Sequence, residues 1–145
     1  MATVNSDGTP HNTPYFFMRS DDLTRLYWSS SPRSQHSKNV ERTGEIFVVL
    51  YEANAGGGLY IQCHNARIAT GTDLNEAIVT HNQVRKKHGL EPLSNDFYTD
   101  ESVQKMYVAD TEKFWINQSI RDERGNIVED SRIEVSKDEL LEISV

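Results

Sequence analysis

The stretch that decides the fold runs from residue 25 to residue 51 and reads Arg-Leu-Tyr-Trp-Ser-Ser-Ser-Pro-Arg-Ser-Gln-His-Ser-Lys-Asn-Val-Glu-Arg-Thr-Gly-Glu-Ile-Phe-Val-Val-Leu-Tyr. Its pattern predicts a short aromatic strand at 26–28, a helix at 34–42 that ends at Thr43-Gly44, and a buried central strand at 46–51. Hydroxyl and cationic side chains lie between the first strand and the helix: Ser29, Ser30, Ser31, Arg33, Ser34, His36, Ser37 and Lys38. Such donors suit a bound phosphate, because backbone N–H groups and the helix dipole add to them there. A polar loop that caps the helix explains this composition equally well.

Short strands are predicted on both sides of this corner. Residues 1–4 and 11–18 read as a hairpin around Asp7-Gly8, and the apolar run at 15–18 reads as a strand covered on both faces. Pro10 and Pro14 place the start of that strand at an edge or a bulge. Further strands are expected at 59–70, 105–108, 113–117 and 127–135. This regular spacing predicts a mainly β, barrel-like fold with flanking helices, in one domain that spans residues 1–145.

The clearest helix is predicted at 73–89. Asp73 and Glu76 have the spacing of a capping box, and Gly89 closes the helix. Its apolar face consists of Leu74, Ala77, Ile78, His81 and Val84. A helical turn is expected at 100–105 and a half-helix at 137–141. The glycine run at 54–58 is expected to connect two strands, since it lacks the strand-before and helix-after context of a dinucleotide fingerprint.

Composition excludes several classes of protein. The net charge of −7 argues against a nucleic-acid binder. Cys63 is the only cysteine, so the chain has no internal disulfide and fits a reducing compartment. No run of about 18 apolar residues could span a membrane, and the first residues lack a signal-peptide pattern. The expected location is therefore the cytoplasm.

The residues give no strong signal for a metal site or a nucleophile. Among the five histidines only His64 adjoins the cysteine, and neighbours on a strand point to opposite faces. His81 is expected to be a satisfied core histidine, and Cys63 is expected to be buried and inert. The paired carboxylates at 21–22, 122–123 and 129–130 read as solvated loops.

Three stretches together resemble the pyridoxamine 5′-phosphate oxidase-like, FMN-binding split-barrel family. They are Ala-Thr-Val-Asn-Ser-Asp-Gly-Thr-Pro at 2–10, Leu-Tyr-Trp-Ser-Ser-Ser-Pro-Arg-Ser-Gln-His-Ser-Lys-Asn-Val at 26–40, and Met-Tyr-Val-Ala-Asp-Thr-Glu-Lys-Phe-Trp-Ile-Asn at 106–117. They follow one another in the family's order. The resemblance implies an FMN-binding split β-barrel that forms a homodimer with FMN at the interface.

The resemblance also implies which residues bind the cofactor. The strand at 13–17, with Thr13, Tyr15 and Phe16, would lie along the flavin edge. Trp28, Ser29 and Ser30 would lie beside the ring and the ribityl chain. Ser34 and His36 stand at the family's phosphate-binding positions, Lys38 is within reach of the phosphate, and Asn39 matches an asparagine that follows them in the family. Trp115 and Asn117 of the other subunit would lie near the ring system.

Two departures from the family pattern bear on activity. His36 stands where family members carry a lysine, although Lys38 could still reach the phosphate. Arg121, Glu123 and Gly125 stand where the true oxidase carries an Arg-x-His-x-Arg pattern that holds pyridoxal phosphate. Because a glutamate repels a phosphate, pyridoxamine phosphate oxidation itself is not expected.

The expected function is therefore that of a flavoprotein oxidoreductase. FMN would exchange hydride or electrons with a small molecule or a nicotinamide donor, and no side chain stands out as an obligatory acid or base. Two alternatives stay open. One is a flavin-binding or flavin-storing protein without turnover, and the other is a relative that uses a deazaflavin or haem.

Overall fold

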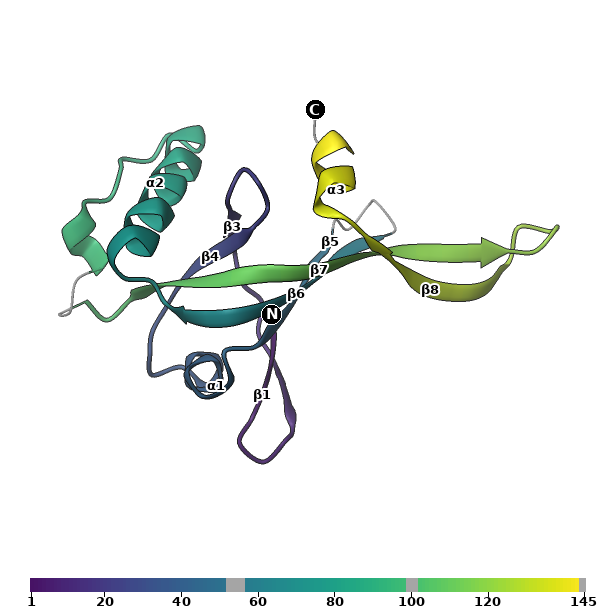
Figure 1. Ribbon diagram of the computed structural model, residues 1–145, viewed down its shortest axis with the longest axis horizontal. Coiled ribbons are helices and arrows are strands. Elements are labelled where there is room, and N and C mark those ends of the chain that lie inside the picture. The colour runs from purple at the N-terminus through teal and green to yellow at the C-terminus, as the bar shows by residue number, and fades with distance from the viewer. Residues whose placement is uncertain (52–56, 99–101, 144–145) are drawn as a thin grey trace.

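The computed structural model describes residues 1–51, 57–98 and 102–143. Within these ranges three α-helices flank an eight-stranded antiparallel sheet (Figure 1), which confirms a mainly β fold with flanking helices. The elements are β1 Ala2–Val4, β2 Pro10–Asn12, β3 Met18–Arg19, β4 Arg25–Ser30, α1 Gln35–Thr43, β5 Ile46–Tyr51, β6 Gly58–Ile68, α2 Gly71–Lys87, the 3₁₀ helix η1 Asn95–Tyr98, β7 Lys105–Arg121, β8 Ile127–Val135 and α3 Lys137–Ile143.

β7 organises the sheet because three other strands pair with it. β6 pairs along one edge, while β4 and β8 follow one another along the opposite edge, and the full order is β2-β1-β5-β6-β7-β4-β3. The prediction of two separate strands at 105–108 and 113–117 was wrong. The polar residues between them, such as Asp110 and Thr111, continue the ladder opposite His64 and Cys63. Beyond the body of the sheet, β7 and β8 project as a two-stranded arm (Figure 1).

Apolar side chains pack on both faces of this sheet. Along β4, Leu26 and Trp28 point into the barrel, and Tyr27 points to the face that α2 covers, as strand geometry requires. The barrel core consists of Met1, Leu26, Trp28, Val40, Ile46, Val48, Ile61, Cys63, Ala66, Tyr107, Ala109 and Phe114. The core beneath α2 consists of Met18, Tyr27, Ala69, Ala77, Ile78, Tyr98, Met106 and Val108.

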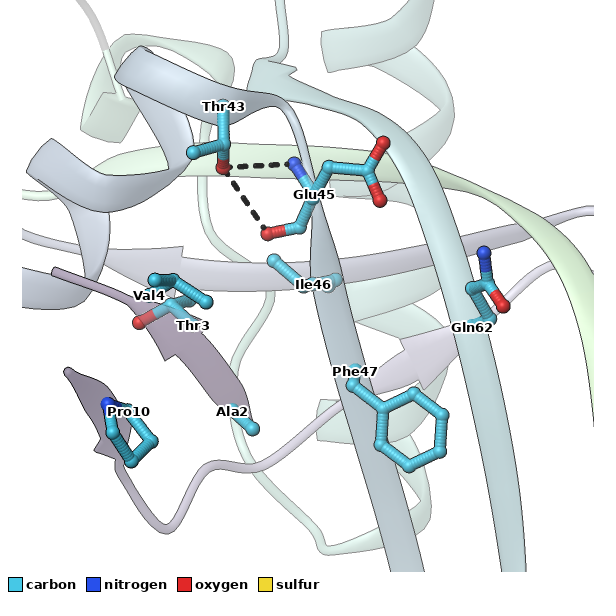
Figure 2. A pocket seen from close by; sticks show the side chains of 9 residues that line it. All are labelled: Ala2, Thr3, Val4, Pro10, Thr43, Glu45, Ile46, Phe47 and Gln62. Carbon is cyan, nitrogen blue, oxygen red and sulfur yellow. Dashed lines mark hydrogen bonds between the residues drawn. The ribbon is translucent and has the colours of Figure 1, made fainter. Parts of the chain in front are cut away.

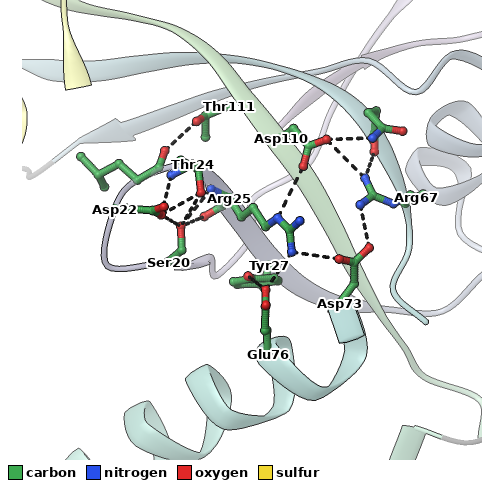
Figure 3. Close-up of polar contacts among 12 residues, drawn as sticks. Ser20, Asp22, Thr24, Arg25, Tyr27, Arg67, Asp73, Glu76, Asp110 and Thr111 are labelled. Carbon is green, nitrogen blue, oxygen red and sulfur yellow. Dashed lines mark hydrogen bonds and ion pairs between the residues drawn. The ribbon is translucent and has the colours of Figure 1, made fainter. Parts of the chain in front are cut away.

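Ion pairs fix the first turns of α2 on the sheet (Figure 3). Asp73 accepts from Arg25 of β4 at 2.9 Å and from Arg67 of β6 at 2.6 Å, and Arg25 also reaches Glu76 at 2.7 Å. The capping-box prediction was therefore wrong, since the N-cap is Thr70 and both carboxylates turn to arginines. Charge-assisted bonds to guanidinium groups outcompete a local cap here. The predicted buried face of this helix is confirmed by Ala77 and Ile78.

The N-terminal hairpin is confirmed only in part. β1 pairs with β2 from Ala2↔Asn12 to Val4↔Pro10, and Gly8 adopts a φ of 84° in the turn. The covered strand predicted at 15–18 was wrong, because β2 ends at Asn12 and Phe16 is 63% exposed. Pro14 has no N–H group to extend the ladder, so the chain leaves the sheet and returns only at β3.

The remaining elements follow the prediction closely. α1, β4, β5, β6, β8 and α3 occupy the expected stretches, and Gly44 ends α1 with a φ of 66°. Residues 54–56 of the predicted glycine connection and residues 100–101 of the predicted helical turn lie outside the described residues. The described part of that turn was wrong, because residues 102–104 are not helical and Lys105 begins β7.

Candidate functional site

The serine-rich corner folds into a closed hydrogen-bonded cluster. His36 Nε2 lies 2.7 Å from Ser30 Oγ and 2.9 Å from Ser34 Oγ. Ser37 Oγ lies 3.0 Å from Ser30 Oγ and 2.9 Å from Ser34 Oγ. Ser30, His36 and Ser37 are buried and Ser34 is half-buried. The predicted donors do meet in space, but they form hydrogen bonds to one another. Of these four side chains, Ser34 is the most accessible to a ligand.

Burial also decides the charge of this cluster. It lowers the pKa of His36 below its ordinary value, and the nearby His11 acts in the same direction. His36 is therefore neutral at neutral pH and does not replace the positive charge of a lysine. The side chains of Arg33 and Lys38 are exposed and carry the positive charge of this corner.

The first turn of α1 has no side-chain cap. Its N-cap residue, Ser34, has an extended backbone, but the hydroxyl donates to Ser31 O at 2.8 Å and makes no capping bond. The first turn also contains no acidic residue. An anion at this end of the helix would meet backbone N–H groups, the helix dipole and two exposed cations.

A cavity of about 550 Å³ lies between the segment that follows β2 and the outer side of β5. Tyr15 and Phe17 form one wall, and Phe47, Val49 and Tyr51 form the other. The lining is completed by Met1, Ala2, Asn12, Thr13 and Pro14. A volume of this size and an aromatic lining are typical of a small-molecule site.

Tyr15 connects this cavity to the serine-histidine cluster. Its ring lies edge-on to His36, with ring centroids 5.0 Å apart, while the ring of His11 lies 6.4 Å from His36. Thr13 also lines the cavity, and its Oγ1 lies 3.1 Å from His11 Nε2. Thr13, Tyr15, Ser34 and His36 are therefore the predicted site residues that the fold brings together.

Figure 2 shows the residues that line a second cavity, of about 470 Å³. Ala2 and Phe47 line both cavities. The walls of the second cavity are mostly apolar and include Val4, Pro10 and Ile46, and Glu45 supplies the only carboxylate among its lining residues. Phe47 thus separates two hollows along the outer face of β5.

An aromatic surface continues from Phe47 across the sheet. The rings of Tyr60 and Trp115 lie 6.4 and 6.0 Å from Phe47, and the guanidinium of Arg132 lies 3.7 Å above the ring of Tyr60. Asn117 lies near this surface, where its Oδ1 accepts the backbone N–H of Gly58 at 2.9 Å. Trp115 and Asn117 therefore lie away from the serine-histidine cluster of their own chain.

Several predicted contact residues lack the surface that a ligand contact would need. Trp28 is 0% exposed and stacks on Tyr107 in the barrel core. Asn39 is buried and donates to Thr3 Oγ1 and Asn5 Oδ1, so it ties α1 to the N-terminal hairpin. The alternation of β4 turns Ser29 to the opposite face from Ser30, where it bonds to Gln104 at 3.3 Å.

Phe16 was assigned to the cofactor edge, but its neighbours Tyr15 and Phe17 are the rings that line the cavity. Phe47, Val49 and Tyr51 line the cavity but were not among the predicted site residues. The signal was present, because Ile46–Tyr51 is apolar at every position and so has an apolar outer face as well as an inner one.

Other chemistry is limited. Cys63 is buried, as expected, and burial raises its pKa to about 12, so the thiol is unreactive at neutral pH. His81 packs beside Tyr98, whose hydroxyl lies 3.1 Å from Nδ1. Within the described ranges no group of His, Cys, Asp and Glu side chains is placed to hold a metal ion. No helix among the described elements is long and apolar enough to cross a bilayer.

Comparison with known proteins identifies the fold. No protein-family model matches the sequence, and no curated protein does. A pyridoxamine 5′-phosphate oxidase-related, FMN-binding protein from Nostoc punctiforme is 15% identical, with a TM-score of 0.56 over 93% of this chain and 84% of the other. An F420 reductase is 16% identical, with a TM-score of 0.54 over 78% and 84%. A heme-binding protein from Mycobacterium smegmatis is 14% identical, with a TM-score of 0.59 over 92% of this chain and 50% of the other.

The chain therefore has the split-barrel fold of pyridoxamine 5′-phosphate oxidase-like proteins, as the sequence resemblance implied. The names of these similar structures mention FMN, F420 and heme, so the fold alone does not identify the cofactor.

Proposed function

We propose that this chain is a cytoplasmic flavoprotein that binds FMN without a covalent bond. The observation that carries the proposal is the aromatic cavity of about 550 Å³ that Tyr15 joins to the uncapped first turn of α1. A planar ring with an anionic tail needs those two features side by side.

The residues of the site fit the two ends of FMN. Tyr15, Phe17 and Phe47 offer aromatic and apolar surface for a planar ring. The first-turn N–H groups of α1, together with Ser34 and Lys38, offer donors and charge for a phosphate. His36 contributes position rather than charge, because its ring is neutral and holds Ser34 and Ser30 in place.

When bound, FMN would supply hydride or electron transfer, and the chain would orient it and exclude water from one face. The partner in the reaction would be a small molecule or a nicotinamide donor. Pyridoxamine phosphate oxidation is not proposed, because Glu123 repels phosphate where the oxidase binds it. A second copy of the chain, which brings its Trp115 to the open side of the cavity, would complete the site as a homodimer.

Two alternatives remain testable within this proposal. A flavin-storing protein would use the same cavity without turnover. A relative that uses a deazaflavin or haem in place of FMN is the other alternative, since an F420 reductase and a heme-binding protein have similar structures.

The first test compares FMN with riboflavin, which has the same ring but no phosphate. The expected result is tighter binding of FMN, and a loss of at least about tenfold in FMN affinity in Lys38→Glu, since a charge-assisted contact becomes a repulsion. Riboflavin affinity should not change. Lys87→Glu is the matched control, because Lys87 is exposed on α2 and makes the same change of charge. Equal affinity for both ligands, or an unaffected Lys38→Glu variant, would show that the phosphate is not bound at α1.

The second test separates an oxidoreductase from a storage protein. Under anaerobic conditions, NADH or NADPH should bleach the oxidised flavin absorbance of the loaded protein. Bound flavin that stays oxidised with both donors would favour storage, and mass spectrometry of the ligand released on denaturation would reveal a deazaflavin or haem.

A further inference from the structure

A further cavity, of about 660 Å³, lies between the outer side of α2 and the segment that follows this helix. One wall is a stripe of α2 that contains Val79, Gln83 and Lys86, which share a face because they lie four and three residues apart. The other wall is the segment 89–92. We call this hollow the α2 cavity. It shares no lining residue with the two cavities beside β5.

Hydrogen bonds hold the second wall of the α2 cavity in place. After Gly89, which has a φ of 68°, the chain runs back beside α2 (Figure 1). Arg85 Nε donates to the carbonyl of Glu91 at 2.6 Å. The amide group of Asn82 donates to Leu93 O at 3.0 Å and accepts the N–H of Leu93 at 2.8 Å. The two walls are therefore held together before any ligand binds, as is usual for small-molecule sites.

Two apolar side chains line the α2 cavity and remain exposed. Val79 is 57% exposed and Leu90 is 52% exposed. Leu93, by contrast, packs against the core beneath α2, so the segment has a separate residue that anchors it to the fold. Together with Pro92, the two exposed side chains offer an apolar surface on which an aliphatic group can be buried.

One cation and one carboxylate also line the α2 cavity, namely Lys86 and Glu91. Within the part of the chain that the structure describes, the charged end of neither side chain takes part in a hydrogen bond or an ion pair. The dipole of α2 favours cations in its last turn, which accounts for Arg85, Lys86 and Lys87 as a group. It does not account for a carboxylate that lines the same cavity as Lys86 without pairing with it.

We propose that the α2 cavity binds a free α-amino acid with an aliphatic side chain. The carboxylate of the ligand would meet Lys86, its ammonium group would meet Glu91, and its side chain would lie on Val79 and Leu90. The charges of the cavity favour this class, because Glu91 would repel a simple anion and Lys86 would repel a simple cation. A ligand without net charge is also not repelled by a chain whose net charge is −7.

The first experiment titrates L-leucine into the purified full chain labelled with nitrogen-15 and follows the amide resonances by NMR. Leucine should shift the resonances of residues 83–91 with a dissociation constant of about 1 mM or below. Three compounds each lack one part of leucine: glycine lacks the aliphatic side chain, 4-methylpentanoate lacks the ammonium group, and 3-methylbutylamine lacks the carboxylate. Each should bind at least about fivefold more weakly than leucine, since each loses one of the three contacts.

The second experiment assigns each charge of the ligand to its partner. Lys86→Gln should weaken leucine binding by about fivefold and should not weaken 3-methylbutylamine, which has no carboxylate. Glu91→Gln should weaken leucine binding by a similar factor and should not weaken 4-methylpentanoate, which has no ammonium group. The matched controls are Lys87→Gln and Glu129→Gln, because both residues are exposed and neither lines the α2 cavity. Both controls should leave leucine binding unchanged.

The outcomes decide the inference. It is overturned if about 10 mM leucine shifts no resonance of residues 83–91, or if any of the three compounds binds as tightly as leucine. An effect of Lys87→Gln as large as that of Lys86→Gln also overturns it. If a variant fails to fold, as judged by circular dichroism, the series of compounds decides the question with the native chain. A chain that binds leucine as expected but never binds a flavin leaves this inference standing and overturns the proposed function.

Discussion

The cluster of Ser30, Ser34, His36 and Ser37 is closed although its sequence suggests an open site, and the outer face of β5 is open although its sequence suggests a buried strand. Ser30, Ser34, His36 and Ser37 look like an open binding site in the sequence, yet the fold closes them on one another. The stretch Ile46–Tyr51 looks like a buried strand, yet its outer side chains are open in the folded chain.

The difference follows from how each kind of side chain is satisfied. Hydroxyls and an imidazole can be donors and acceptors for one another, so a cluster of them needs no ligand to be stable when buried. Apolar rings cannot be satisfied by their own solvated surface, and they gain free energy only when another surface covers them. An open apolar face is therefore the stronger pointer to a partner.

The largest expected effect comes from replacing each of the two tryptophans. Trp28→Ala should lower the free energy of unfolding by about 3–5 kcal/mol, because it removes a fully buried ring that stacks on Tyr107. Trp115→Ala should lower the free energy of unfolding of the single chain much less, because this ring is half-buried beside Phe47 on the outer face of the sheet. Urea unfolding of both variants at one low protein concentration checks the order. Equal losses would mean that Trp115 is a core residue too.

A smaller effect is expected within the serine-histidine cluster. Ser30→Ala should cost about 1 kcal/mol, because Ser30 bonds to His36 and Ser37 in a buried setting while Ser34 still satisfies both partners. Ser29→Ala is the control, since its hydroxyl bonds to Gln104 at an exposed position and should cost less. Chemical denaturation of both variants measures the difference. Identical stabilities would show that the cluster contributes little to the fold.

The weakest expected effect is a dependence of stability on pH. Burial lowers the pKa of His36 in the folded chain below the 6.5 of an unfolded histidine, so the unfolded chain binds the proton more readily. The free energy of unfolding should therefore be highest above about pH 6.5. It should fall as the pH drops towards the lowered pKa that His36 has in the folded chain. Thermal unfolding between about pH 7 and pH 5 measures this slope, above the range where most carboxylates titrate.

His36→Gln should flatten the slope. His81 has a pKa lowered by burial and then by Arg85, so it contributes in the same direction, and His81→Gln serves as the comparison. A slope that His81→Gln flattens but His36→Gln leaves unchanged would contradict the buried neutral state of His36.

Much of the fold could be predicted because it depends on local pattern. Gly44 and Gly89 ended the predicted helices, and the apolar runs of β5 and β8 marked their strands. The prediction was wrong where residues that are distant in the sequence bind a side chain that a local motif was expected to use. Asp73 was assigned to a cap by its spacing, but Arg25 and Arg67 arrive from two strands and bind it.

The candidate site shows the same division. The spacing of Ser30, Ser34 and His36 predicted that these side chains would gather, since a strand end and a helix start bring them within one turn. Whether Ser29 or Ser30 joins them depends on which face of β4 meets the barrel, and that is set by pairing with β7.

The sequence by itself determined most of the strands and helices, the split-barrel fold and the polar corner before α1, because each is encoded in side chains that are close along the chain. Only the tertiary structure decided that this corner is closed and that Phe47, Val49 and Trp115 share an open face. Exposure depends on which residues from distant strands cover a side chain, and covering is a property of the packed molecule rather than of any stretch within it.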